Sequence, residues 1–455
     1  MSRSLSILSP TGHLGFTPIE RGSFELGVAR HPDAIVADSG SCDIGPQPLG
    51  ADEHCSPEEW QRHDLELMLL AARTLRVPMI IGSASDTGTN RGVDQYAHII
   101  RALARQHGLA PFTLATIHSE VSRDEVARRM KGGARIEGLD GRADLTPEEL
   151  ARTDRIVAVM GVAPIIGALD QGADVVIAGR SSDSCIFAAP AIRAGFPEAA
   201  SYYLGKVLEC ASFAAEPFMG KESIIGTVTA DAVSVTAMHP GQRCTVASVS
   251  SHAMYERANP FFEHVAGGVL DMTHCRYEQA GERTTRVTGF TFRRDDVYRI
   301  KLEGAGRVGE RALSIAGIRD PYTIEHIDAV IAWAQGKVKE RWGDPGERYQ
   351  LYYHVYGRDG IMGPLEPQRA PAHELCLVIE AVAPRWEDAE VICALGTRNL
   401  FYARLPDVKG TAGTAALMMD EVLRGKPGYE WTLNHVMPLA DPLELTTVAV
   451  EVVGA

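Results

Sequence analysis

One stretch, Gly172–Phe196, constrains the fold of this chain more than any other; it reads GADVVIAGRSSDSCIFAAPAIRAGF. Val175–Ala178 is a short, wholly apolar run, which is typical of a strand buried on both faces by helices. A polar turn from Arg180 to Ser184 follows, and apolar, helix-forming sequence resumes at Ile186. Because the free N–H groups of a helix N-terminus point into such a turn, this pattern predicts a ligand site in an α/β sheet.

Two side chains of this turn can carry chemistry. Arg180 can form a bidentate contact with a carboxylate or phosphate, and Asp183 can act as a general acid or base. The alternative is purely structural: Asp183 or Ser184 caps the helix, and Arg180 pairs with the carboxylate. The turn alone leaves both interpretations open.

Upstream of this stretch, strand-like runs alternate with helical patterns. The predicted strands are 5–8, 33–37, 77–81, 112–117, 155–160 and 175–178. Two helices are expected to begin at capping-box sequences with proline at the first helical position, Ser56–Glu59 and Thr146–Glu149. This alternation predicts an α/β protein with a mostly parallel, doubly wound sheet.

The carboxyl ends of parallel strands lie on one edge of the sheet, where ligands bind. We therefore expect the polar turns after these strands to converge. The candidate catalytic residues are Asp183, Asp86, His13 and Cys42. The candidate substrate-binding residues are Arg180, Ser181, Asp38, Ser41, Ser85 and Asn90, with Arg243 from a later turn as a second cation.

The sequence changes character after about residue 220, and three regions are predicted. Residues 1–220 form the parallel α/β domain that carries the site. Residues 221–345 form an α+β region packed on it, with strands over 224–238 and 244–255 and a helix over 323–342. Residues 346–455 form a ferredoxin-like module, with strands over 374–382, 431–437 and 446–453, helices over 386–395 and 414–423, and a polar turn over 395–401.

Charge and cysteine content exclude several classes of protein. The formal net charge is −14 and no basic cluster is interleaved with aromatic residues, so no nucleic-acid partner is expected. No apolar stretch approaches the length of a membrane span, so we expect a cytoplasmic protein without a membrane partner. The eight cysteines are scattered without a CxxC pair, which indicates reduced thiols and no zinc motif.

The cofactor remains unknown from the sequence. There is no GxGxxG after the first strand and no GxxxxGK[ST], so neither dinucleotide nor nucleoside triphosphate binding has direct support. The residue types at Asp38, Asp43 and Asp86 would also suit a divalent metal, although salt bridges and caps are commoner roles for carboxylates.

Ala173–Ser184 (ADVVIAGRSSDS) resembles the signature ADxVxTGRxxDxA of the acyclic terpene utilisation family, usually called AtuA-like proteins. Four other segments resemble family segments in the same order along the chain: 78–90, 157–169, 204–214 and 239–260. The C-terminal part resembles the small ferredoxin-fold module that accompanies this family. Residues 11–18 and 83–89 depart from the glycine-rich family pattern, which is typical of a divergent member.

The resemblance implies a role in carboxylic-acid or acyl-CoA catabolism. The leading hypothesis is an enzyme without a nucleotide cofactor, a lyase, hydratase or isomerase that acts on a small carboxylate or acyl thioester. A second is a hydrolase or acyl transferase, with Cys42, Ser41 or Cys185 as nucleophile and His13 or His118 as base. A third is a non-catalytic subunit of a catabolic complex. A homo-oligomer is expected in each case.

Overall fold

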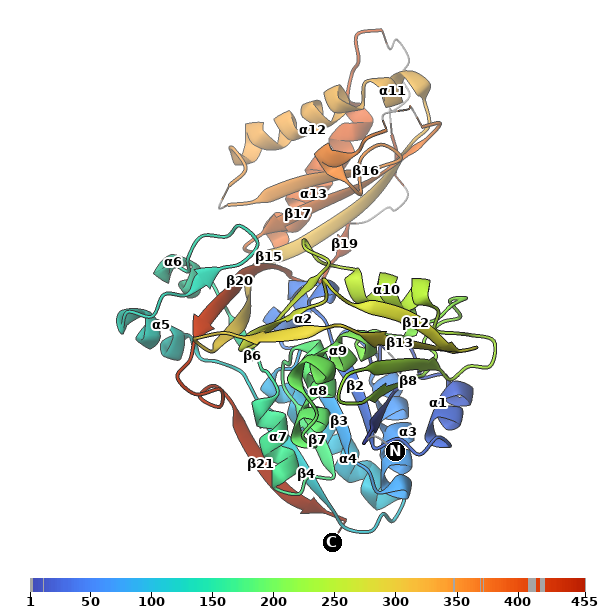
Figure 1. Ribbon diagram of the computed structural model, residues 1–455. Helices are drawn as coiled ribbons and strands as arrows, with labels where there is room; N and C mark the ends of the chain where they lie inside the picture. The colour runs from blue at the N-terminus through green and yellow to red at the C-terminus, as the bar shows by residue number, and fades with distance from the viewer. Residues whose placement is uncertain are drawn as a thin grey trace. The chain divides into compact units, whose positions relative to one another are not determined.

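The structure, a computed structural model, describes residues 3–10, 12–346, 348–368, 370, 372–407, 415–417 and 422–454. The chain forms two compact units (Figure 1). The first unit comprises Met1–Gly306 together with Trp431–Ala455, and the second comprises Arg307–Glu430. The boundary expected near residue 220 falls inside the first unit, and the one expected near residue 345 falls inside the second.

A ten-stranded sheet organises the first unit. Its five central strands are parallel and lie in the order β1 (Leu5–Ser9), β2 (Ala34–Gly40), β3 (Met79–Asp86), β7 (Val175–Ala178) and β4 (Phe112–His118). Antiparallel strands extend it beyond β1, namely β8 (Ile224–Val228), β9 (Val233–Ala237), β13 (Thr284–Thr288) and β12 (Arg276–Gly281). Strand β21 (Thr447–Val453) extends it beyond β4. The protein is therefore of mixed α/β class, and only the centre of the sheet is parallel.

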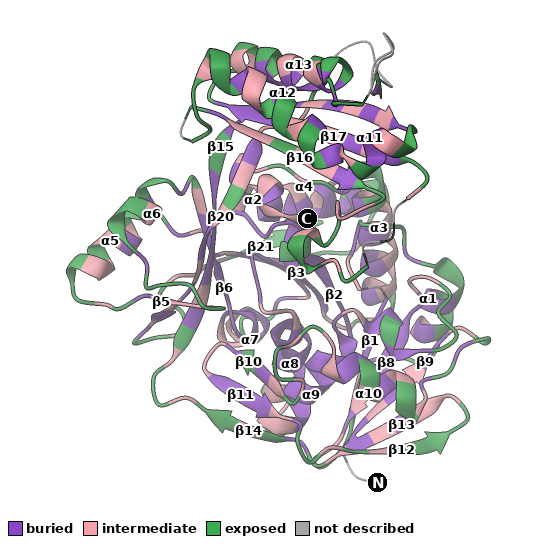
Figure 2. Ribbon diagram, turned by 90° about the horizontal axis from the view of Figure 1, so that it is seen from above, coloured by how far each residue is buried: buried purple, intermediate pink, exposed green. Residues whose placement is uncertain are grey.

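Helices cover both faces of the central strands, and Figure 2 shows these strands as largely buried. Neighbouring residues of β3 point to opposite faces. Met79 and Ile81 pack with α1 (Arg21–Val28), α3 (Glu58–Leu75) and α4 (Asn90–Gln106). Ile80 packs with α7 (Ala163–Asp170), α8 (Asp183–Arg193) and α9 (Glu198–Leu208). Burial on both faces explains why these strands read as continuous apolar runs.

Three local expectations are corrected. The segment expected as a member of the parallel sheet at 155–160 is β6 (Arg155–Val159), which instead pairs antiparallel with β15 (Arg299–Ile318). The strand expected over 244–255 is helix α10 (Val246–Met254), because the side chains of Thr245 and Ser248 cap its N-terminus reciprocally. The capping box at Thr146 is confirmed, whereas that at Ser56 does not form, because the Ser56 hydroxyl bonds Asp86.

The second unit is built on the latter part of β15, which pairs with β17 (Leu375–Ala383), and β17 pairs with β16 (Gln350–Tyr356). Its helices are α11 (Pro321–Glu325), α12 (Ile327–Trp342) and α13 (Trp386–Tyr402). Helix α13 runs through the turn expected at 395–401. The helix expected over 414–423 lies partly outside the described residues, and its described part includes the short strand β18 (Ala416–Leu417) and the start of β19 (Leu423–Arg424).

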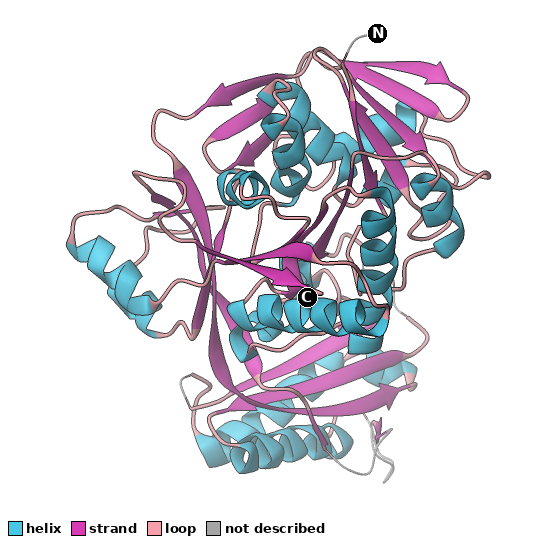
Figure 3. Cartoon of the chain, turned by 90° about the horizontal axis from the view of Figure 1, so that it is seen from below, coloured by secondary structure: helices cyan, strands magenta, loops and turns pink. Residues whose placement is uncertain are grey.

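The remaining elements are distinguished by type in Figure 3. They are η1 (Cys42–Ile44), α2 (Pro46–Ala51), α5 (Arg123–Lys131), β5 (Glu137–Gly138), α6 (Pro147–Ala151), η2 (Ala211–Ala214), β10 (Phe262–Val265), β11 (Gly268–Asp271), β14 (Thr291–Arg294), η3 (Gly363–Leu365) and β20 (Gly428–Pro438). Within the described ranges, no helix is long and apolar enough to cross a membrane.

Candidate active site

The carboxyl ends of β2, β3 and β7 meet at one edge of the sheet. Asp38 pairs in register with Gly82, and Gly40 pairs with Asp86. The turn that follows β3 is tied to the turn that follows β7, because the backbone N–H of Arg180 donates to the carbonyl of Gly88 at 3.0 Å. Only glycine fits at position 88, where an added Cβ would lie 2.2 Å from the backbone nitrogen of Arg180. The edge therefore brings Asp38, Asp86 and the Arg180–Asp183 turn together.

The turn after β3 has an unusual backbone. Ser83, Ser85 and Asp86 have φ values of 50°, 56° and 72°, the left-handed region that normally selects glycine. Such conformations cost on the order of 1 kcal/mol each and persist where surrounding contacts determine them. Here the contacts are hydrogen bonds made by the same three side chains. Three residues other than glycine therefore hold a glycine-like backbone at this turn.

Arg180 is buried at the centre of the edge. Its Nε donates to Oε2 of Glu303 at 2.8 Å, and its Nη2 lies 3.5 Å from Oε1 of the same carboxylate. Its Nη1 donates to Ser83 Oγ at 2.9 Å and to Asp183 Oδ1 at 3.2 Å. Burial opposes the charge, but Glu303 and Asp183 raise the pKa of Arg180 well above its usual range. The bidentate face expected to bind substrate is therefore engaged by Glu303.

Glu303 is the main site residue that sequence reasoning missed. It lies on β15, opposite Val157 of β6, and is almost completely buried. Burial alone would raise its pKa, but Arg180 and then Lys301 lower the pKa of Glu303 to about 2. Lys301 Nζ lies 2.8 Å from Glu303 Oε1. The available sequence clue was this pair of opposite charges two positions apart, a spacing that places both side chains on one face of a strand.

Asp38 and Asp183 are two carboxyl groups close to one arginine. Asp38 is buried; its Oδ2 accepts from the N–H of Gly40 at 3.1 Å, and its Oδ1 has no hydrogen-bond partner among the described residues. Burial, and then the neighbouring Asp183, raise the pKa of Asp38 well above its usual range. Asp183 begins α8, and its side chain is 39% exposed. Burial raises the pKa of Asp183 to about 6, against the pull of Arg180.

Asp86 is fully buried, and unlike Asp38 and Asp183 it is surrounded by several hydrogen-bond donors. Its Oδ1 accepts from the Ser56 hydroxyl at 2.5 Å and lies 3.0 Å from Nε2 of His13. Its Oδ2 accepts from the backbone N–H groups of Cys55 and Ser56, both at 2.9 Å. Burial opposes ionisation, but the hydrogen bonds from His13 and Ser56 outweigh it and lower the pKa of Asp86. Asp86 is thus a charged acceptor that orients His13.

Some of the other predicted site residues lie at this edge of the sheet, and others only make local hydrogen bonds. Ser181 Oγ donates to the carbonyl of Gly179, and Ser41 caps η1 by accepting from Asp43 N–H. Ser85 Oγ donates to Gln95, and Asn90 exchanges hydrogen bonds with Glu120. Cys42 is exposed; burial of the sulfur, and then Glu303, raise the pKa of its thiol. Arg243 is exposed in the loop after β9, where its backbone pairs with Glu216.

A second buried charge cluster lies behind Asp183 and was also missed. Lys206 on α9 is fully buried, and its Nζ lies 2.5 Å from Oε1 of Glu209 and 3.9 Å from Oε2 of Glu263. Arg257 contacts both glutamates. Glu209 is one of the charges that raise the pKa of Asp183. The protonation of Asp183 is therefore sensitive to groups on α9 as well as to Arg180.

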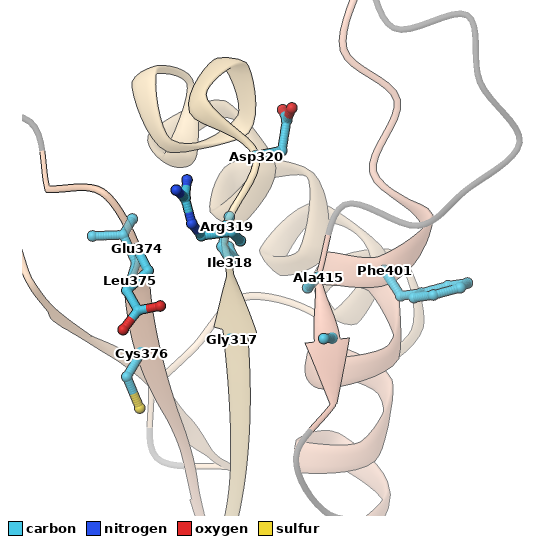
Figure 4. A pocket seen from close by; sticks show the side chains of 10 residues that line it. Gly317, Ile318, Arg319, Asp320, Glu374, Leu375, Cys376, Phe401 and Ala415 are labelled. Atoms are coloured by element: carbon cyan, nitrogen blue, oxygen red, sulfur yellow. The ribbon is translucent and has the colours of Figure 1, made fainter.

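Within the part of the chain that the structure describes, no group of three or more His, Cys, Asp or Glu side chains is arranged to hold a metal ion. A separate pocket of about 590 Å³ lies in the second unit (Figure 4). Arg319, Asp320, Glu374 and Cys376 are among its lining residues. None of the residues lining it belongs to the Arg180 cluster.

The fold and the site define a mixed α/β protein with an acid–base cluster at the carboxyl edge of its central parallel strands. The sequence pattern of the family described as "Acyclic terpene utilisation family protein AtuA" matches residues 7–429. The chain belongs to this family. The family description implies a role in acyclic terpene utilisation, a catabolic pathway. Searches of curated proteins and of solved structures gave no match.

Proposed function

We propose that the protein is a catabolic enzyme that moves protons on a small carboxylate or acyl thioester, as a lyase, hydratase or isomerase. One observation carries the proposal: Asp183 is a partly exposed carboxyl group, its pKa is raised to about 6, and it lies 3.2 Å from the buried Arg180. A general acid–base group works best when its pKa lies near the operating pH.

The two aspartates divide the chemistry between them. At neutral pH Asp183 is mostly ionised, so it can accept a proton from a carbon next to a carbonyl. Asp38 is the more deeply buried of the two, and burial and then the neighbouring Asp183 raise its pKa well above the usual range, so it is the proton donor of the pair in this proposal. Returning the proton elsewhere on the substrate gives an isomerisation, and expelling or adding water gives a dehydration or hydration. N–H groups at the start of α8 would stabilise the negative charge that develops on the carbonyl oxygen.

The nucleophile hypothesis has less support. A thiolate is the reactive form of cysteine, and burial raises the pKa of the Cys185 thiol to about 12. The thiol pKa of Cys42 is raised as well. His13 is hydrogen-bonded to Asp86 and His118 to Asp94, and among the described residues no hydrogen bond joins either imidazole to Cys42, Ser41 or Cys185.

The second unit supports a narrower structural proposal. Its elements follow the order β15, α12, β16, β17, α13 and β19, and β15 lies between β17 and β19. That order is typical of ferredoxin-like modules. We therefore propose that the second unit is a ferredoxin-like module and that the protein binds a small carboxylate or acyl thioester.

Hydrogen exchange on candidate substrates tests the proposal without knowledge of the product. The purified protein is incubated in D₂O with a panel of small carboxylates and acyl-CoA thioesters, and mass spectrometry follows deuterium incorporation at carbon. We expect Asp183→Asn to lower the exchange rate about 10²–10⁴-fold with the melting temperature retained. The exposed helix residue Asp124→Asn serves as the matched control. Unchanged exchange in folded Asp183→Asn protein would overturn the assignment.

A further inference from the structure

The two edge strands of the ten-stranded sheet differ in how well they are protected from pairing with another chain. One edge is β12, which carries Arg276, Glu278 and Gln279 and breaks its register with β13 between Gln279 and Gly281. Charges and irregular pairing are the means by which proteins prevent edge strands from pairing with other chains. The other edge is β21, beside β4 (Figure 1). Only one of the two edges has this protection.

Strand β21 reads TVAVEVV and pairs with β4 without a break, from Thr447 opposite His118 to Val453 opposite Phe112. It contains no proline and no bulge. Its single charge, Glu451, is paired with Arg101 of α4 at 2.5 Å. Val450 and Val452 are nonetheless 40% and 64% exposed. A regular, valine-rich edge strand of this kind offers unpaired backbone groups and exposed apolar side chains together.

We propose that β21 pairs antiparallel with β21 of a second copy of this chain, so that two ten-stranded sheets join across a two-fold axis. A two-fold axis through Val450 aligns all seven residues of both strands, because each residue then faces the one equally far on the other side of position 450. Val450 faces its own copy, and Val448 faces Val452. Such an interface is closed, so it ends at a dimer rather than a fibre.

The side chains of β21 suit this register on both faces. Val448 packs against the hydrophobic cluster that includes α7, so Val448, Val450 and Val452 share that face and would form an apolar ladder across the axis. Val453 packs with α4 on the opposite face, where Glu451 meets Arg101. Glu451 faces Ala449 in this register, so no like charges are directly opposite. Each glutamate also brings its own arginine, which leaves the interface close to neutral.

The mass of the protein in solution tests this interface. Light scattering after size exclusion should give about twice the 49.2 kDa of the chain for the full-length protein. Val450→Glu places two carboxylates directly opposite each other, so we expect the dimer dissociation constant to rise at least about tenfold. Val452→Glu, at the most exposed position of the strand, should act in the same direction. Val308→Glu is the matched control, because Val308 is a strand valine of the second unit whose exposure, 48%, lies between those of Val450 and Val452.

A second measurement needs no substitution. Backbone amide exchange of residues 447–453 should slow as protein concentration is raised through the dissociation constant, while exchange in β12 stays constant. A monomer at about 100 μM would overturn the proposal. So would a dimer that survives both Val450→Glu and Val452→Glu, or one that Val308→Glu dissociates equally well.

Discussion

Asp86 and Asp183 occupy comparable places at the carboxyl edge of neighbouring parallel strands, yet their carboxylates have opposite surroundings. Asp86 is fully buried and accepts from backbone N–H groups, a hydroxyl and an imidazole. Asp183 has one cation, Arg180, which is already bound to Glu303. The pKa of Asp86 is lowered and that of Asp183 is raised to about 6.

The difference shows that the position on the sheet does not decide the role of a carboxylate here; the number of hydrogen-bond donors does. A carboxylate with every oxygen satisfied is held ionised and serves as an anchor. A carboxylate that must share its cation keeps the proton longer and can exchange it near neutral pH. Each of the following substitutions removes one of these two carboxylates, or a group that interacts with it or with Arg180.

The largest effect on the free energy of unfolding is expected from Glu303→Gln, which removes the main charged partner of Arg180. This change leaves a buried guanidinium with only the partly exposed Asp183 as a charged partner in direct contact, and breaking a buried ion pair costs about 3–5 kcal/mol. Urea unfolding measures the free energy of unfolding. Glu340→Gln is the control, because its ion pair with Lys337 lies at the surface and contributes about 1 kcal/mol or less. Equal losses in the two variants would contradict the central role of the Arg180–Glu303 pair.

The second-largest effect distinguishes Asp86 from Asp183. Asp86→Asn keeps one oxygen for the N–H groups of Cys55 and Ser56 but removes the charge and puts an NH₂ group where Oδ1 accepted from Ser56 and His13. We therefore expect a loss of about 2–3 kcal/mol in the free energy of unfolding. Asp183→Asn should leave the free energy of unfolding at neutral pH unchanged or raise it, because burial disfavours the ionised form of this carboxyl group in the folded protein. The comparison of Asp86 with Asp183 fails if the two variants are equally stable.

A smaller effect is expected from Ser56→Ala, which removes the shortest hydrogen bond to Asp86. We expect about 1.5 kcal/mol from the loss of a hydroxyl bonded to a charged acceptor. In a double-mutant cycle with Asp86→Asn, the two losses should be less than additive, since both act on the same carboxylate. Additive losses would show that Ser56 contributes through packing rather than through Asp86.

Part of this architecture was predictable from the sequence. Continuous apolar runs such as Val175–Ala178 identified the central strands, because burial on both faces removes the alternation that an exposed strand would show. The antiparallel extensions were not predictable in the same way. The strand at 446–453 read as part of a C-terminal module, but it pairs with β4, more than 300 residues earlier in the chain, and no local pattern encodes such a pairing.

The candidate site was predictable where residues follow strands, and not where they come from elsewhere. Asp38, Asp183 and Arg180 were found because parallel strands place their carboxyl ends together. Glu303 was missed because it lies within a strand of another part of the chain. The surroundings of Asp86 were not predictable for a different reason. Its partners Cys55 and Ser56 precede a helix, and the sequence suggested that Ser56 would cap that helix instead.

The smallest expected effect is the pH dependence of the free energy of unfolding. It tests the comparison because Asp86 and Asp183 should change this free energy in opposite directions as the pH rises. The lowered pKa of Asp86 contributes stability above the usual aspartate value of about 3.9, and this is lost as the pH falls through the folded-state value. The raised pKa of Asp183 contributes stability below about 3.9, which is lost as the pH rises toward about 6. Asn at position 183 mimics the protonated carboxyl group, so the stability of the wild type relative to Asp183→Asn should decline between about pH 4 and pH 6 and stay level above pH 7. Because Asp183 is partly exposed, solvent screening keeps this decline smaller than the effects above. Urea unfolding of both proteins across pH 4–8 measures it, and a stability difference that does not change with pH would show that Asp183 titrates as an ordinary surface carboxylate.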